Sequence, residues 1–309
     1  MAIFNVINEY ILSHVLRFLM GIFSNNFAVA IFVFTLVINL CMIPLTIKSQ
    51  KSSMQQTRIK PKLDALKEKY GDDKQKYSVA MQDLYTKEKV SMSGGCLPMI
   101  VHLVFLMSIY YLVLGPITYL TTVDTATVQE LATAMGITVK NNLRLDLDVI
   151  AKVTASGFTA PAGFEAQTNE ILAAVNQINF NFFGIDLTSV PKFTPNLSKA
   201  EINWIIPFLS FAAAMFSSLL SIRTQKKANP SGPSMTGMML FMPIISLIIA
   251  FSAPCGLGFY WACSSFVSAI IQEGVQRFCG PHKMIARERS KEIIKRYELE
   301  KKSLDSVKD

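Results

Sequence analysis

Five stretches of about 20 predominantly apolar residues constrain the fold of this chain more than any other feature. They cover residues 27–47, 95–118, 204–222, 235–253 and 257–277. About 20 such residues are what an α-helix needs to cross the hydrocarbon core of a bilayer. A soluble protein of 309 residues would have to bury all of these stretches in one core. The sequence therefore predicts an all-α membrane protein with five transmembrane helices.

The composition agrees with this class and gives no sign of a metal or disulfide framework. Hydrophobic residues make up 51% of the chain and charged residues 17%, against roughly 25% charged residues in soluble domains. The cysteines are odd in number and lack the spacing of a metal site, so neither a disulfide framework nor a zinc site is expected, and no cofactor is predicted. They are Cys41, Cys96, Cys255, Cys263 and Cys279.

Residues 1–24 have the pattern of an amphipathic helix. Asn5, Glu9, Ser13 and Arg17 recur every four residues, which places them on one helix face, opposite apolar residues. We expect this helix to lie in the plane of the membrane interface, and a short uncleaved anchor is the alternative. A signal peptide is not expected, because the segment lacks a basic start and a cleavage site of small residues.

The polar segment 48–93 is predicted to form a helical hairpin. Good helix formers fill residues 51–70 and 74–89, and Gly71-Asp72-Asp73 turns the chain between them. At about 1.5 Å per residue, each arm would reach roughly 25–30 Å beyond the bilayer. A hairpin that is merely held at the membrane surface by its basic charge is the alternative interpretation.

Two other segments lie outside the predicted spans. Residues 119–203 form an insert whose fold the sequence does not determine, although its stretch INFNFFGIDLTSVP is expected to rest at the membrane interface. Residues 278–309 form a basic tail with Glu and Lys at helical spacing. This tail is either a solvated helix or one that binds anionic lipid or RNA.

The distribution of Lys and Arg predicts the orientation of the chain. Eleven of these residues lie in 48–93, three in 223–233 and ten in 277–309, whereas the 119–203 insert has five against eight acidic residues. Because loops rich in Lys and Arg stay in the cytoplasm, we expect the hairpin and the C-terminus inside and the N-terminus outside. The predicted location is the cytoplasmic membrane of a bacterium.

Polar side chains inside the predicted spans are the candidate functional residues. No span has a Lys, Arg or Asp near its middle, but the first contains Asn39, the second His102, and the fifth a polar stripe at steps of three and four. Serines at such spacing are typical of close helix packing, whereas ionisable groups inside a membrane often mark a functional site. If these side chains face one another, they line a polar recess. The candidates are Asn39, His102, Ser218, Trp261, Ser264, Ser265 and Gln272.

Three motifs make the chain resemble the YidC/Oxa/Alb family of membrane protein insertases, in particular a bacterial five-span member. They are INLCMIPLTIKSQKSS at 38–53, DLYTKEKVSMSGGCLPMIVH at 83–102 after the basic IKPKLDALKEKY, and FSAPCGLGFYWACSSFVSAIIQ at 251–272. The likeness extends from about residue 27 to residue 277, and the 119–180 part of the insert matches poorly. The glycine, proline and Tyr-Trp signatures in this order are highly specific.

The resemblance implies a function. Family members hold a hydrophilic groove that is open to the cytoplasm and to lipid, along which a nascent apolar segment slides into the bilayer. The candidate residues above would line that groove. The hairpin would receive the substrate, and the tail would approach ribosomal RNA, where basic charge gives salt-sensitive binding. The implied partners are nascent membrane proteins, the ribosome, the Sec translocon and membrane lipids. The receiving residues are Lys60, Lys62, Lys67, Lys69 and Tyr70.

The chain departs from the family pattern at two of these positions. The family typically has an arginine five residues before the proline of the first motif, and here that position is Asn39. A glutamine of the second span corresponds to His102. We hypothesise that Asn39 keeps the groove hydrated and that His102 supplies charge when protonated. The lost arginine also puts electrostatic capture of acidic flanks in doubt.

Two other functions share many of these features. A small-solute transporter or channel would also need polar residues in its spans, but the sequence has no inverted repeat, no pair of broken helices and no carboxylate in mid-span. An assembly factor that packs inserted helices without inserting them has no distinguishing signature. An enzyme is not expected, because no nucleophile–base pair, zinc-protease motif or phosphate loop is present.

Overall fold

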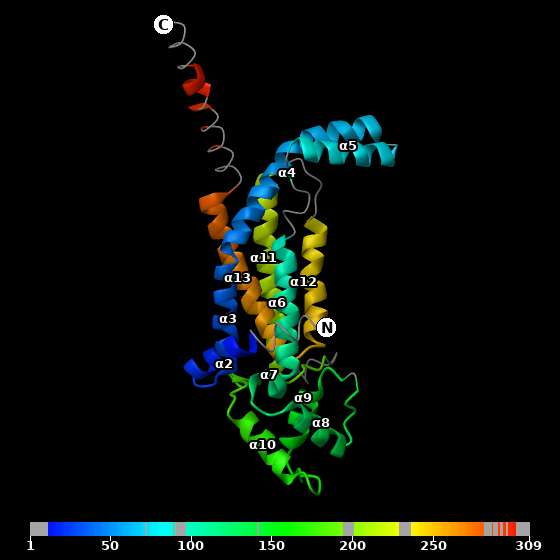
Figure 1. The fold of residues 1–309 in the computed structure, drawn as a ribbon, viewed down its shortest axis with the longest axis vertical. Coiled ribbons are helices and arrows are strands. Elements are labelled where there is room, and N and C mark those ends of the chain that lie inside the picture. Colours follow the sequence, from blue (N-terminus) through cyan, green and yellow to red (C-terminus); the bar gives the residue numbers. More distant parts are fainter. Residues whose placement is uncertain are drawn as a thin grey trace. The chain divides into compact units, whose positions relative to one another are not determined.

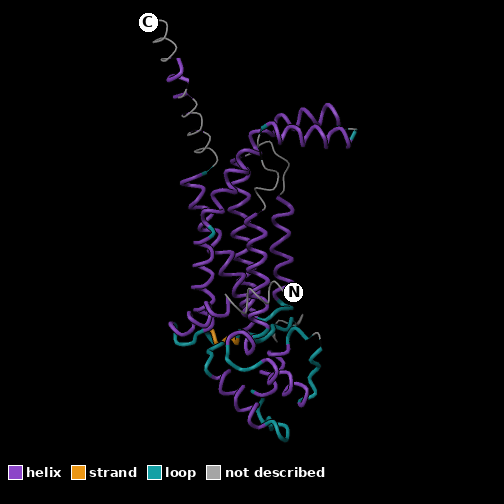
Figure 2. Tube along the Cα trace, in the orientation of Figure 1, coloured by secondary structure: helices purple, strands orange, loops and turns teal. Residues whose placement is uncertain are grey.

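The computed structural model describes residues 12–71, 73–88, 90, 97–140, 142–193, 201–228, 236–280, 286, 290, 293, 294 and 296–300. The start of the predicted interfacial helix, the Gly-Gly-Cys motif with Cys96, and most of the basic tail lie outside these residues. Helices dominate the described part (Figure 2). The chain divides into two compact units. They are Met1–Leu40 with Val101–Leu219 and Met235–Ala269, and Cys41–Ile100 with Leu220–Ser234 and Ile270–Asp309.

Two described helices are long and apolar enough to cross a membrane, at Ile202–Arg223 and Cys255–Phe278. The pair Phe27–Cys41 and Ile43–Ser52, interrupted at Met42, would make a third if it acts as one span. Shorter apolar helices lie at Ile100–Leu114 and Met239–Ala250. A mainly helical protein with helices of spanning length is thus confirmed, whereas the count of five spans stays a prediction.

The first unit is built on long apolar helices, traced in Figure 1. They are α3 (Phe27–Cys41), α6 (Leu97–Leu114), α11 (Ile205–Ala228), α12 (Thr236–Ala250) and α13 (Cys255–Cys279), of which α6, α11, α13 and the last residue of α3 extend into the second unit. The predicted range 95–118 is divided at Gly115, since α6 ends at Leu114 and a new helix begins at Pro116. The lack of a backbone N–H in Pro116 suits it to the first position of a helix.

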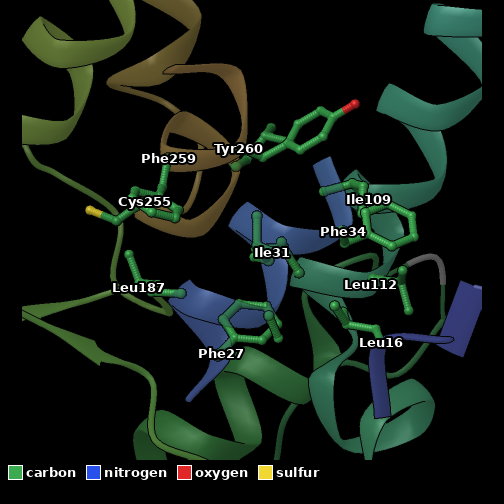
Figure 3. Close-up of a cluster of buried hydrophobic side chains, with 14 of the residues drawn as sticks. Leu16, Phe27, Ile31, Phe34, Ile109, Leu112, Leu187, Cys255, Phe259 and Tyr260 are labelled. Atoms are coloured by element: carbon green, nitrogen blue, oxygen red, sulfur yellow. The ribbon is translucent and has the colours of Figure 1, made fainter. Parts of the chain in front are cut away.

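One apolar cluster holds this unit together (Figure 3). Phe27, Ile31 and Phe34 of α3 meet Ile109 and Leu112 of α6 there. The opposite sides of the helices expose large apolar side chains, which suits contact with lipid. Among these are Phe32, Leu103, Phe208, Leu209, Phe216, Phe241, Ile248 and Phe266.

Helix α2 (Ser13–Ile22) has two apolar faces. Leu16 and Met20 are buried in the cluster, whereas Phe18 and Ile22 are exposed. The Nε atom of Arg17 donates a hydrogen bond of 2.8 Å to the carbonyl oxygen of Tyr119. The helix is therefore fixed on one side and offers an apolar surface on the other, and its place in a membrane interface stays a prediction.

The insert folds as a small helical bundle with its own core. It contains α7 (Pro116–Leu120), α8 (Thr125–Ala134), α9 (Leu145–Val153) and α10 (Glu165–Asn176). Figure 1 shows α8, α9 and α10 gathered beyond the ends of the long helices, on the side where α2 lies. The core residues are Ile117, Val123, Val128, Leu131, Ala132, Val149, Ile150, Val153, Ile171 and Val175.

A short hairpin joins the insert to the long helices. Strands β1 (Asn181–Phe182) and β2 (Ile185–Asp186) pair antiparallel, with Asn181 opposite Asp186. After β2, the carbonyl oxygens of Leu187 and Ser189 accept hydrogen bonds of 2.8 Å from the backbone N–H groups of Gly256 and Cys255. These are among the N–H groups that the first turn of α13 leaves without an intrahelical partner. A 3-10 turn, η3 (Ile202–Trp204), then leads into α11.

The glycines at the start of α13 allow this close packing. A Cβ atom at Gly256 would lie 3.2 Å from the carbonyl oxygen of Leu187 and 3.2 Å from Cγ1 of Val113. A Cβ atom at Gly258 would lie 2.8 Å from Cγ2 of Ile206. The Gly-Leu-Gly of the third motif therefore has a packing role.

The second unit contains α4 (Ile43–Tyr70) and α5 (Lys74–Lys87), which contact each other and run side by side (Figure 1). Asp73 caps α5 by accepting a 3.1 Å hydrogen bond from the N–H of Lys76, which lowers the pKa of its carboxyl. Lys62 of α4 forms an ion pair with Glu88, and this hydrogen bond lowers the pKa of Glu88. The two helices thus pack against each other over the described residues, and a cytoplasmic hairpin stays a prediction.

Candidate functional site

Asn39 lies near the end of α3 with only 5% of its surface exposed. Its Nδ2 atom donates a hydrogen bond of 2.8 Å to the carbonyl oxygen of Thr35, one turn earlier. This bond uses one N–H donor of the amide group within its own helix. The acceptor atom, Oδ1, is left free to accept a hydrogen bond from another helix. An amide in an apolar helix thus has one internal and one external partner.

The external partner is Ser268 of α13, whose hydroxyl donates a hydrogen bond of 2.6 Å to Oδ1 of Asn39. The same hydroxyl lies 3.4 Å from Nε2 of His102 on α6. Ser264, one turn earlier on α13, lies 3.4 Å from the same nitrogen. We call Asn39, His102, Ser264 and Ser268 the polar network. It joins the mainly apolar helices α3, α6 and α13.

The chemistry of the polar network is that of hydrogen bonding and of one titratable ring. The hydroxyl of Ser264 can donate to or accept from Nε2 of His102, depending on the tautomer of the ring, whereas the hydroxyl of Ser268, whose hydrogen is donated to Asn39, can only accept from that nitrogen. Ser264 is buried, and His102 and Ser268 are half-buried. In the part of the chain that the structure describes, no group of three or more His, Cys, Asp or Glu residues is placed to hold a metal ion.

The structure brings together some of the predicted residues. Asn39 and His102 both contact Ser268, and Ser264 contacts His102, while a groove lined by these residues stays a prediction. The residue that links them, Ser268, belongs to the polar stripe of the fifth span but was not among the predicted site residues. The sequence signal that could have identified Ser268 is its spacing of seven residues from Trp261, because residues i and i+7 lie on the same face of a helix.

Three predicted residues lie on α13 or α11, outside the polar network. Ser265 and Trp261 are half-buried on α13, and Trp261 packs against the apolar cluster. Ser218 is half-buried on α11. No hydrogen bond between described residues links these three to the network. Whether they line a groove stays a prediction.

Gln272 lies in the second unit and has a contact of its own there. The hydroxyl of Ser221 on α11 donates a hydrogen bond of 3.4 Å to Oε1 of Gln272 on α13. This pair ties the two helices where they enter the second unit. The predicted convergence of Gln272 with Asn39 and His102 remains untested.

The predicted receiving residues lie on α4, and most of them are solvated. Lys62, Lys67 and Lys69 are exposed, and the Nζ atom of Lys69 lies 5.0 Å from the ring centroid of Tyr70. Lys60 is half-buried. Tyr70 also borders a hollow of about 450 Å³ on the α5 side, which Gln75, Lys76, Val79, Ala80 and Asp83 complete.

The sequence model of one protein family, described as 60Kd inner membrane protein, matches residues 18–281. The chain belongs to this family. The matched region contains the polar network, the helical hairpin α4–α5 and every apolar helix from α3 to α13. Family membership and the apolar helices together make it a bacterial inner-membrane protein.

Individual relatives agree with the family. A protein of Bradyrhizobium diazoefficiens named membrane protein insertase YidC is 28% identical over 260 residues, which cover 82% of this chain and 34% of that protein. A protein of the same name from Brucella melitensis is 29% identical over 255 residues, covering 82% of this chain and 33% of its own length. One from Pseudoalteromonas atlantica is 42% identical over 108 residues, or 34% of this chain and 20% of that protein. The chain thus spans about a third of the length of the first two relatives.

Proposed function

We propose that this protein is a membrane protein insertase, which helps nascent apolar segments to enter the bilayer. The observation that carries the proposal is the family match over residues 18–281, with relatives that are named membrane protein insertase. The polar network supports it, because it provides hydrogen-bonding groups within helices that are otherwise suited to lipid.

In the proposed mechanism, the protein lowers the free-energy barrier for moving the polar flank of a substrate across the membrane. Moving a charged flank of a substrate through hydrocarbon costs at least several kcal/mol. A hydrated recess at Asn39 and His102 would replace part of that hydrocarbon by water and hydrogen-bonding groups. The apolar segment would then partition into lipid at about 25 cal/mol per Å² of buried apolar area. The protein would change the rate of partitioning, with no covalent chemistry and no change in the end states.

The proposal includes a topology. Five spans, with the hairpin and the C-terminus in the cytoplasm and the N-terminus and insert outside, agree with the Lys and Arg distribution. The exposed lysines of α4 would then face the cytoplasm and meet the substrate as it leaves the ribosome. Contact of the basic tail with the ribosome, and an association with the Sec translocon, belong to the same proposal.

Reconstitution tests the function. Liposomes that contain only this chain should integrate a single-span protein with a short polar tail, measured as protection of the inserted segment from added protease. Solute flux without integration would favour a transporter or channel. If the liposomes show neither integration nor solute flux, but helices inserted by other means assemble better in the presence of the protein, an assembly factor would be favoured.

Crosslinking tests the route of the substrate. A photoreactive residue at positions 39, 102 or 272 should crosslink to stalled nascent chains if the three positions share a hydrated recess. Position 246 is the matched control, because Ser246 is exposed on α12 and its hydroxyl donates to its own helix, at the carbonyl oxygen of Met242. Labelling by lipid alone at 39, 102 and 272 would show that these residues only pack helices.

A further inference from the structure

The turn between β1 and β2 contains a residue that the fold does not explain. Phe183 has a φ of 50° and the following Gly184 a φ of 85°. Two-residue hairpin turns with both φ values positive favour Asn-Gly or Gly-Gly, and a bulky side chain is disfavoured in this region. The side chain of Phe183 is also 86% exposed. Its side chain therefore adds little to the folded core, although its backbone is held in a strained conformation.

The neighbouring residue shows that the hairpin itself is well anchored. The ring of Phe182 packs on Phe259 of α13 with 4.7 Å between ring centroids. The Oδ1 atom of Asn181 accepts a hydrogen bond of 2.8 Å from the N–H of Gly184 and so supports the turn. Phe182 thus faces the protein, and Phe183, whose ring meets that of Phe182 edge-on at 4.8 Å, projects from the tip with most of its surface exposed.

The tip lies beside the beginning of a helix that is long enough to span the membrane. A Cβ atom on Gly184 would be 3.7 Å from Cδ1 of Ile202, and Ile202 is the first residue of the apolar helix Ile202–Arg223. Ile202, Ile205 and Phe208 are all exposed, at 52%, 55% and 49%. An exposed apolar surface therefore continues from the tip along this helix.

A second group of aromatic side chains lies at the same end of the same helix. The ring of Phe193 stacks on Trp204 at 5.6 Å, and Phe251 at the end of α12 meets both rings edge-on. Phe193 is itself exposed. Aromatic residues gather where the ends of membrane-spanning helices meet the lipid headgroups. The first turn of α11 thus lies at the depth where such a belt is expected.

We propose that Phe183 is a membrane anchor, whose ring enters the boundary between headgroups and acyl chains of the adjacent leaflet. The partner is the lipid surface, because the tip continues the apolar face of a spanning helix, and a charge near the tip, Asp186, accepts hydrogen bonds from Thr188, two residues further along the chain. The anchor would hold the insert against the bilayer. This proposal depends on the membrane location and is independent of insertase activity.

Photocrosslinking to lipid tests the anchor directly. The full chain with benzoylphenylalanine at position 183, in bilayers of phosphatidylethanolamine and phosphatidylglycerol, should gain the mass of a lipid on illumination. The same group at Gln129, an exposed position of α8, is the control and should give at least tenfold less lipid adduct. The proposal would be overturned if positions 183 and 129 gave equal amounts of lipid adduct. It would also be overturned if, in native membranes, position 183 crosslinked to another protein and not to lipid.

A substitution separates anchoring from folding. Asn suits a positive φ, so Phe183→Asn should keep the hairpin and leave stability in detergent equal or higher. In bilayers, its backbone amides at 182–185 should exchange hydrogen several-fold faster than those of the wild type, because no aromatic ring at the tip inserts into the lipid. Phe183→Trp should exchange like the wild type. Unchanged exchange in Phe183→Asn would show that the ring has no anchoring role.

Discussion

The hydroxyl of Ser268 donates a 2.6 Å hydrogen bond to the side-chain oxygen of Asn39, across 229 positions of sequence. This bond joins the first and the last of the long apolar helices of the chain. A hydrogen bond between helices in lipid contributes about 0.6 kcal/mol on average and up to about 2 kcal/mol. The bond therefore fixes how the two helices are rotated against each other more than it stabilises the fold.

A double-mutant cycle measures this contact. Asn39→Ala and Ser268→Ala should each destabilise the protein, and the double variant should lose less than the sum of the two. We expect a coupling of about 0.5–2 kcal/mol, measured by unfolding in mixed micelles of mild detergent and SDS.

The control for this cycle uses a serine that bonds only within its own helix. Ser246→Ala should show no coupling to Asn39→Ala, since the Ser246 hydroxyl donates to the carbonyl oxygen of Met242 on α12. A coupling as large as that of Ser268 would mean that the cycle reports a general loss of packing.

Gly258→Ala tests the close approach of α13 and α11. The added Cβ atom would lie 2.8 Å from Cγ2 of Ile206, which is buried and branched and so has little room to move. Overpacking of this kind costs about 1–3 kcal/mol, and we expect a loss of thermal stability in detergent. Gly274→Ala on the same helix is the matched control, because nothing lies within 4 Å of its Cβ position. Equal stability of both variants would show that the contact at Gly258 relaxes freely.

The helices of this protein could be predicted because apolar length and loop charge are local properties of the sequence. The range 257–277 is close to α13, which covers Cys255–Cys279. The range 27–47 was less accurate, since the structure interrupts it at Met42. Hydropathy alone does not report such a break, because both halves are apolar at their junction.

The candidate site was predictable only in part. Asn39 and His102 stand out as polar residues among apolar ones, so their sequence context suffices to find them. Ser268 does not stand out, because a serine in a membrane helix usually bonds to its own backbone. Its role depends on the rotation of α13 against α3 and α6, which no local pattern encodes.

The insert was not predictable for a different reason. Its helices are nine to twelve residues long, apart from the five-residue α7, and such short helices form only through tertiary packing. One of its key contacts is a buried carboxylate, Asp146, which a sequence pattern would assign to the surface. The core of the insert therefore becomes visible only in three dimensions.

His102→Gln tests whether the ring of the polar network acts as a charge. An imidazole can take up a proton between pH 5 and 8, and an amide cannot. If the proposed function is correct, the ratio of insertion yields of wild type and variant should change between pH 8 and pH 5.5, most clearly for substrates with acidic flanks. His14→Gln, at an exposed position of α2, controls for loss of a histidine and should leave the ratio constant. A constant ratio for His102→Gln would show that the ring serves as a neutral hydrogen-bonding group.

Asp146 should make the stability of the insert depend on pH. Burial raises the pKa of its carboxyl above the ordinary value, although hydrogen bonds from the N–H of Thr118 at 2.7 Å and from the Thr118 hydroxyl at 3.2 Å favour the charged form. In the window that starts at the ordinary Asp pKa of about 3.9, the folded insert keeps a proton that the unfolded chain has released. The free energy of unfolding should therefore fall as pH rises through this window and become constant above it. Asp146→Asn should remove this slope, whereas Glu130→Gln, at an exposed position of α8, controls for the loss of one carboxylate. Hydrogen exchange of the α7–α9 amides from pH 4 to pH 7 measures the effect, and an unchanged slope in Asp146→Asn would contradict it.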